Sequence, residues 1–125
     1  MKIIDIDFKE MLNDLEFYAG RNGGSSKKFI ISGKDVVKLE GYIYEPGYES
    51  FSVTHSIALN GEMLFGKDSK NVGPYHNEEY TFGKFNSDKE TIEYLKQYFG
   101  DKEINIQYDE HKLQENNLQD EEEIQ

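Results

Sequence analysis

Two neighbouring segments alternate apolar and polar positions, and this alternation constrains the fold more than any other feature of the chain. In residues 37–44 and 51–59 every second position holds an apolar residue, except for Gly41 and His55, and this is the period of a half-buried β-strand. Asn60-Gly61 follows the second segment and favours a type I′ hairpin, because both residues tolerate a positive φ. Residues 62–65 then form the return strand. We therefore expect antiparallel pairing.

Two other segments carry the start and stop signals of helices. In each, an Asp or Ser is followed three positions later by Glu, the pattern of a capping box, and a glycine ends the apolar stripe. These signals predict helices at 8–19 and 88–99. The residues concerned are Asp7, Glu10 and Gly20 for the first helix, whose stripe is Phe8, Met11, Leu12, Leu15 and Tyr18, and Ser87, Glu90 and Gly100 for the second.

The remaining segments complete an α+β domain. Short strands are expected at 27–32, 80–85 and 103–108, with a flexible connection at 21–26 and a long aperiodic loop at 66–79. The order of elements predicts a mainly antiparallel, twisted sheet of about five to six strands with two helices packed on it. A single globular domain covers residues 1–108, and residues 109–125 form an acidic tail that we expect to be disordered.

Charge separates the tail from the domain. The 125 residues include 25 acidic and 14 basic ones, a net charge of −11. Residues 109–125 hold seven acids and one lysine, so the tail contributes −6 and residues 1–108 contribute −5. This sign opposes direct binding to nucleic acid or to an anionic membrane, and it favours a basic protein as the partner.

Several classes of protein are excluded or disfavoured by composition. The chain has no cysteine, so disulfides, thiolate nucleophiles and Cys-ligated zinc are excluded. The N-terminal residues lack the apolar run of about 7 to 15 residues found in signal peptides, and no segment approaches the roughly 20 apolar residues of a membrane span. We expect a cytoplasmic protein, monomeric or homodimeric.

The strands at 37–44 and 51–59 can be aligned by joining their apolar faces. A three-residue loop, Pro46-Gly47-Tyr48, does this by pairing Ile43 with Phe51. Tyr42 and Tyr44 then point to the opposite face of the sheet. Glu45 and Glu49 oppose each other at the tip of the hairpin, where a cationic partner would relieve their repulsion. Two interpretations stay open: a helix covers the tyrosines as a second core, or the tyrosines form an exposed binding surface.

The first predicted helix has a second candidate surface. At about 100° per residue, Glu10, Asp14 and Phe17 fall on a face away from the apolar stripe. Phe17 is then either an aromatic anchor within an acidic rim or a residue covered by a neighbouring loop. The predicted partner-binding residues are Glu10, Asp14, Phe17, Tyr42, Tyr44, Glu45, Tyr48 and Glu49.

Catalytic signatures are missing from the sequence. His55 stands in the apolar alternation and is expected to be a hydrogen-bonded core histidine. No two histidines have metal-ligand spacing, and none of the motifs for zinc, calcium or acyl-transfer chemistry occurs. We therefore expect no catalytic residues, no cofactor and no metal.

These features favour a small acidic, non-enzymatic inhibitor that blocks a basic, nucleic-acid-binding enzyme. By size and charge alone, it would act in the manner of phage anti-CRISPR or anti-restriction proteins and be a partial DNA mimic. A first alternative is an immunity protein or antitoxin against a basic nuclease toxin. A second is a small-molecule-binding domain or enzyme that uses Tyr75, His76, Glu78 and Glu79 of the 66–79 loop. A third is a structural component that self-associates through its tyrosines.

Overall fold

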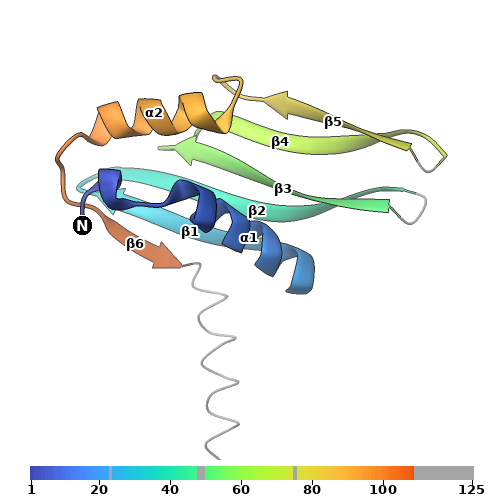
Figure 1. Ribbon diagram of the computed structural model, residues 1–125, viewed down its shortest axis with the longest axis horizontal. Helices are drawn as coiled ribbons and strands as arrows, with labels where there is room; N and C mark the ends of the chain where they lie inside the picture. Colours follow the sequence, from blue (N-terminus) through green and yellow to red (C-terminus); the bar gives the residue numbers. More distant parts are fainter. Residues whose placement is uncertain (23, 48–49, 75, 109–125) are drawn as a thin grey trace, which may run out of the picture.

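The predicted α+β architecture is confirmed by a computed structural model that describes residues 1–22, 24–47, 50–74 and 76–108. The predicted acidic tail lies outside the described residues. Six antiparallel strands form one sheet in the order β5-β4-β3-β2-β1-β6 (Figure 1). The elements are η1 (Ile3–Asp5), α1 (Phe8–Asn22), β1 (Ser25–Ser32), β2 (Asp35–Gly47), β3 (Ser50–Leu59), β4 (Glu62–Gly73), β5 (His76–Phe82), α2 (Asp88–Phe99) and β6 (Asn105–Tyr108).

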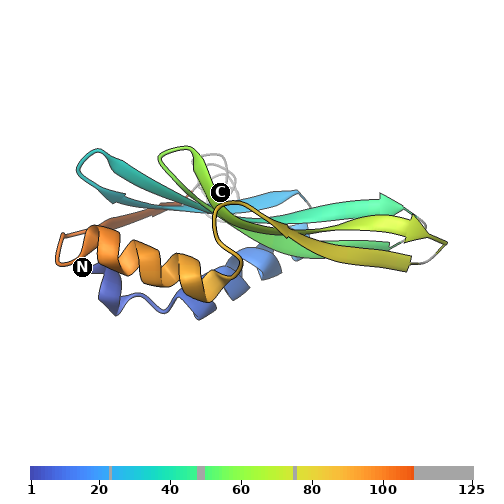
Figure 2. The same ribbon diagram turned by 90° about the horizontal axis from the view of Figure 1, so that it is seen from above.

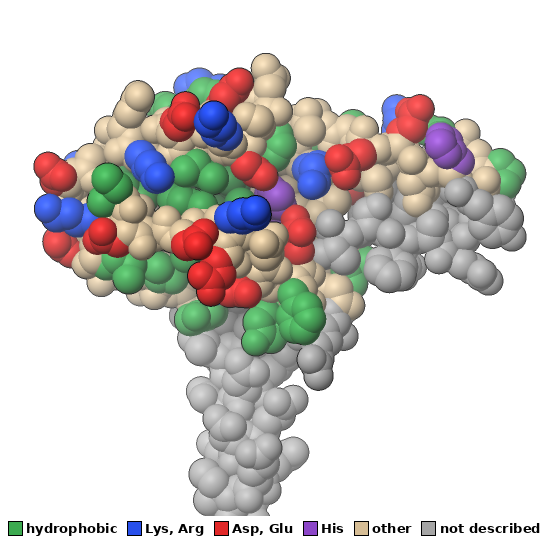
Figure 3. Space-filling model, in the orientation of Figure 1, with side chains coloured by type: hydrophobic (Ala, Val, Ile, Leu, Met, Phe, Trp, Pro, Cys, Tyr) green, Lys and Arg blue, Asp and Glu red, His purple; other side chains and the backbone are tan. Residues whose placement is uncertain are grey.

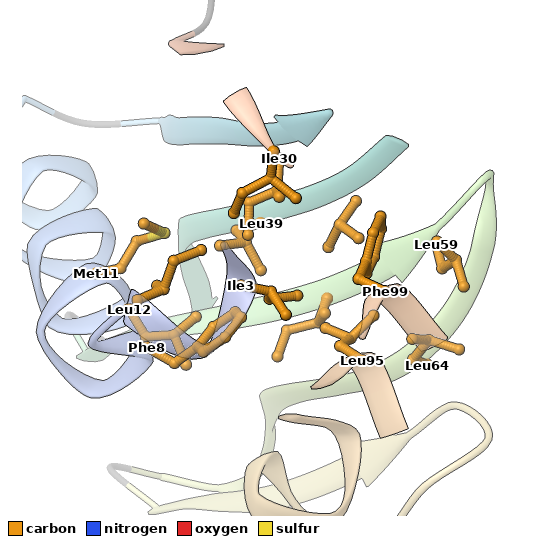
Figure 4. Close-up of a cluster of buried hydrophobic side chains, with 14 of the residues drawn as sticks. Ile3, Phe8, Met11, Leu12, Ile30, Leu39, Leu59, Leu64, Leu95 and Phe99 are labelled. Carbon is orange, nitrogen blue, oxygen red and sulfur yellow. The ribbon is translucent and has the colours of Figure 1, made fainter. Parts of the chain in front are cut away.

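Both helices lie on the same face of the sheet, which we call the helix-bearing face (Figure 2). One apolar cluster joins them to the strands, with Leu39 and Ile57 from the sheet. Ile3 of η1 lies between the side chains of α1 and those of α2 (Figure 4). Within the part of the chain that the structure describes, neither helix combines the length and apolar character needed to cross a bilayer.

The first helix begins at Phe8 as predicted but continues past residue 19. The Asp7 carboxylate accepts a hydrogen bond from the Glu10 backbone N–H at 3.1 Å, which caps the first turn. Gly20 lies within α1 instead of ending it. A glycine inside a helix costs about 1 kcal/mol relative to alanine and does not by itself stop the helix. The buried stripe ends on Ala19, whereas Tyr18 is exposed, so the assignment of Tyr18 to the core is wrong.

The second helix has the predicted bounds, Asp88–Phe99. The Ser87 hydroxyl accepts a hydrogen bond from the Glu90 backbone N–H at 3.2 Å, and the Glu90 carboxylate accepts one from Asn86 N–H at 3.3 Å. Gly100 follows the last turn with a φ of 55° and donates its N–H to the Lys96 carbonyl at 2.9 Å. The sequence signals at both ends of α2 therefore operate as expected.

The central hairpins follow the predicted faces but not the predicted register. Asn60 and Gly61 have φ values of 49° and 85°, which confirms the tight turn between β3 and β4. In β2 and β3, Ile43 lies opposite Val53 where we expected Phe51. The register is thus displaced by two residues, and because an even displacement preserves the alternation, the described side chains of β2 and β3 keep their predicted faces.

The three-residue loop at 46–48 is also wrong. The backbone of β2 continues to Gly47, which pairs with Ser50, and an irregularity in the pairing after Tyr44 absorbs the difference.

Residues 66–79 form a hairpin, so the predicted long loop is wrong. β4 pairs with β5 from Gly66 opposite Phe82 to Gly73 opposite His76. This hairpin extends beyond the helices (Figures 1 and 2). Because neither helix packs on its distal part, the strands need no alternation of apolar residues there, which is why the period was missing.

Three other predicted segments also change their bounds. The predicted connection at 21–26 is shorter, because α1 takes residues 21–22 and β1 starts at Ser25. The strand expected at 80–85 ends at Phe82, and the strand expected at 103–108 starts at Asn105.

Candidate functional site

A glycine lets α1 lie directly on the centre of the sheet. Gly41 on β2 is opposite His55 on β3. A Cβ atom added at Gly41 would lie 2.5 Å from the carbonyl carbon of Leu15 and 2.8 Å from the backbone nitrogen of Glu16. These are backbone atoms of α1, so any side chain at this position would push the helix away. The close approach brings Glu16 beside His55.

His55 joins the two helices to β3. His55 is buried, with only 4% of its surface exposed. Nδ1 contacts Glu16 Oε1, and Nε2 lies 2.7 and 2.9 Å from the two carboxylate oxygens of Asp88, the first residue of α2. The prediction of a hydrogen-bonded core histidine is confirmed. Its partners are 39 and 33 residues away in sequence, so no local pattern identifies them.

The surroundings of His55 favour its protonated form. Burial lowers the pKa of His55, but the hydrogen bonds to Asp88 and Glu16 and their negative charges together outweigh burial, and the pKa is raised above its ordinary value. An imidazolium that donates both N–H groups has no lone pair with which to act as a base. The two carboxylates also lie at opposite ring nitrogens and do not converge on one point. We call Glu16, His55 and Asp88 the histidine cluster.

Tyr42 lies on the opposite face of the sheet, where neither α1 nor α2 packs. The interpretation in which a helix covers it is therefore wrong. Tyr42 is nevertheless half-buried, and its hydroxyl donates a hydrogen bond to the Lys67 carbonyl of β4 at 3.2 Å, across β3. Burial, with the nearby Asp68 carboxylate, raises the pKa of Tyr42. The Tyr42 side chain therefore packs on the sheet, with its hydroxyl hydrogen-bonded to β4.

A second ring covers the same face. Phe82 on β5 is opposite Gly66 on β4, and a Cβ atom added at Gly66 would lie between 2.2 and 2.8 Å from three ring atoms of Phe82. The neighbouring Ser56 and Ala58 are buried although both helices lie on the other face. A glycine opposite an aromatic residue is the signal that could have indicated this packing from sequence.

The predicted partner-binding residues are not all brought together. Glu10 and Phe17 are exposed on α1, and the Asp14 carboxylate lies 3.9 Å from Lys28 Nζ of β1. Tyr42 is on the other side of the sheet. The side chains of Tyr44, Glu45, Tyr48 and Glu49 lie outside the described residues.

Tyr18 of α1 packs beside Phe17, a contact that the sequence analysis did not predict. Phe17 is 58% exposed and Tyr18 is 50% exposed, and their rings pack edge to face with centroids 5.5 Å apart. At about 100° per residue, these two rings share an arc of roughly 100° with Glu10 and Asp14. We call Glu10, Asp14, Phe17 and Tyr18 the α1 patch. On the helix-bearing face as a whole, lysines are interspersed with Asp and Glu side chains (Figure 3).

The residues of the predicted pocket do not share a surface. In β5, His76 and Glu78 are two positions apart and share one face of the hairpin, whereas Glu79 points to the other face. Tyr75 lies outside the described residues. Across the described ranges, no three His, Asp or Glu side chains are arranged to hold a metal ion. Comparison with known proteins finds no matching family model, no similar curated protein and no similar solved structure.

Proposed function

We propose that this protein is a non-enzymatic binding protein that docks on a basic protein surface through the α1 patch and so inhibits a nucleic-acid-binding enzyme. The observation that carries the proposal is the pair of exposed rings, Phe17 and Tyr18, on the same helix face as two acids. Large exposed aromatic residues are the usual energetic centres of protein interfaces.

The chemistry of the α1 patch suits a partner rich in Lys and Arg. Aromatic rings attract cations held over their faces, by about 0.5 to 2 kcal/mol depending on solvent exposure. Glu10 and Asp14 would pair with basic side chains of the partner. The net charge of −11 would accelerate the approach of such a partner.

The lysines interspersed among the acids argue against inhibition by broad imitation of DNA. A chain that imitated DNA over a broad surface would need rows of acids at the spacing of phosphates. The helix-bearing face instead mixes both signs of charge (Figure 3). The proposal is therefore a local aromatic and acidic contact that occupies part of a nucleic-acid groove.

A binding panel tests the proposal. The full chain would be titrated by biolayer interferometry against purified RNA-guided nucleases, restriction endonucleases, uracil-DNA glycosylase and nuclease toxins. We expect one class to bind, with affinity that falls at higher salt and is lost in competition with duplex DNA. Binding only to a nuclease toxin would support the immunity-protein alternative.

The α1 patch is tested with a double variant. Phe17→Ala with Tyr18→Ala should weaken binding at least about tenfold, the loss expected for an interface centre. Tyr80→Ala, an exposed tyrosine of β5, is the matched control and should leave affinity unchanged. Equal affinity of the double variant and the parent would remove the α1 patch from the binding surface.

A further inference from the structure

We propose that the histidine cluster is a proton-dependent link, which holds both helices on the sheet while His55 carries two ring protons and releases the first turn of α2 when one is lost. The proposal rests on the geometry of Glu16, His55 and Asp88 and is independent of the proposed function.

Proton counting gives the first step of the argument. An ionised carboxylate only accepts hydrogen bonds, and a neutral imidazole has one N–H donor and one bare nitrogen. Glu16 and Asp88 occupy both ring nitrogens of His55, so both contacts are hydrogen bonds only in the imidazolium form. Loss of one proton leaves a carboxylate facing a lone pair in a buried position, which is unfavourable.

The groups around the imidazole provide no substitute for the lost charge. Of the titratable residues described, those that face the ring are Glu16 from α1 and Asp88 from α2. β2 presents Gly41 opposite His55, and β4 presents the Phe65 ring, with centroids 6.2 Å apart. Neither of these residues titrates, so the repulsion after deprotonation is uncompensated.

Exposure indicates which helix is released. The Asp88 side chain is 38% exposed and that of Glu16 is 27% exposed, so Asp88 regains water with the smaller rearrangement. Asp88 also stands at the end of α2, where only one turn must move. The far end of α2 stays fixed by the buried Leu95 and Phe99 (Figure 4). Deprotonation therefore opens one end of one helix and leaves the apolar core in place.

Nuclear magnetic resonance of the full chain tests the link. Long-range proton–nitrogen spectra would follow the histidine side chains from pH 5.5 to 9. We expect His55 to carry two N–H protons at the acidic end of this range and to lose one as the pH rises. Backbone amides of residues 86–91 should shift with the His55 midpoint. A single N–H on His55 throughout this range, or amides at 86–91 that do not follow its titration, would overturn the proposal.

Matched variants separate the link from simple packing. Glu16→Gln and Asp88→Asn keep side-chain size and remove one charge, so each should lower the His55 midpoint, which a purely steric role would not do. His76→Gln is the control and should leave the midpoint unchanged. Should Asp88→Asn fail to fold, Glu16→Gln alone decides: an unchanged midpoint in that variant contradicts the link.

Discussion

Gly41 and His55 lie opposite each other on β2 and β3, and together they fix the position of α1. The glycine permits the helix backbone to approach, and the histidine bonds the Glu16 carboxylate that this approach delivers. The contact of His55 with Glu16 depends on Gly41, because a helix held further away would take Glu16 out of reach of the imidazole.

Substitution of Gly41 should therefore be costly. Gly41→Ala places a methyl group against the backbone of Leu15 and Glu16, which cannot rotate away, so we expect the free energy of unfolding to fall by about 1 to 3 kcal/mol. Urea denaturation measures this change. Gly73→Ala is the control, since a Cβ there meets nothing within 4 Å, and it should change stability by much less. Equal effects of the two variants would contradict the close packing of α1.

Gly66 should behave differently, because its neighbour is a side chain. We expect Gly66→Ala to cost less than Gly41→Ala, since the Phe82 ring can turn aside. In a Phe82→Ala background the cost should largely disappear, giving a coupling energy of about 0.5 to 3 kcal/mol in a double-mutant cycle. Additive effects would mean that Phe82 does not pack on Gly66.

Stability should fall as the pH rises through the titration of His55. The pKa of His55 is raised in the folded protein, so its contribution is fully present below the ordinary histidine pKa of about 6.5 and is lost above the raised folded pKa. Urea denaturation of the parent and of His55→Gln between pH 6 and 9 measures this. The difference in unfolding free energy between the two should shrink with increasing pH. A difference that stays constant or grows would contradict the raised pKa.

The cap of α2 offers an independent prediction. Ser87→Ala removes the hydroxyl that accepts the Glu90 N–H and should lower the unfolding free energy by about 1 kcal/mol. Ser87→Asp should restore most of it, because aspartate is an equally good cap. Thermal or urea unfolding distinguishes these outcomes, and no loss in Ser87→Ala would show that the cap contributes little.

Local signals predicted the parts of the fold that depend on neighbouring residues. The bounds of α2, the start of α1 and the Asn60-Gly61 turn follow from capping and turn chemistry, and each is confirmed. The extent of β4 and β5 could not be predicted in this way, because their hairpin projects beyond the helices and carries no apolar alternation.

The histidine cluster could be predicted only in part, because its contacts join residues that are far apart in the sequence. The burial of His55 follows from its place in the alternation, but Glu16 and Asp88 are ordinary helix acids until the two helices meet over the sheet. Tyr18 was assigned to the wrong face because it lies at the margin of the apolar stripe. At about 100° per residue Ala19 lies nearer the centre of the stripe, and Ala19 is the residue that is buried.

The connection between β5 and β6 has a mechanical consequence. These strands are the two edges of the sheet, and α2 is the only helix between them in the chain. Residues 84 and 85 anchor its near end to β4, through hydrogen bonds from their N–H groups to the carbonyls of Met63 and Leu64. The helix is thus a covalent connection between the two edges of the sheet. A force that peels β6 away is transmitted through α2 to residues 84 and 85 and to their hydrogen bonds with β4.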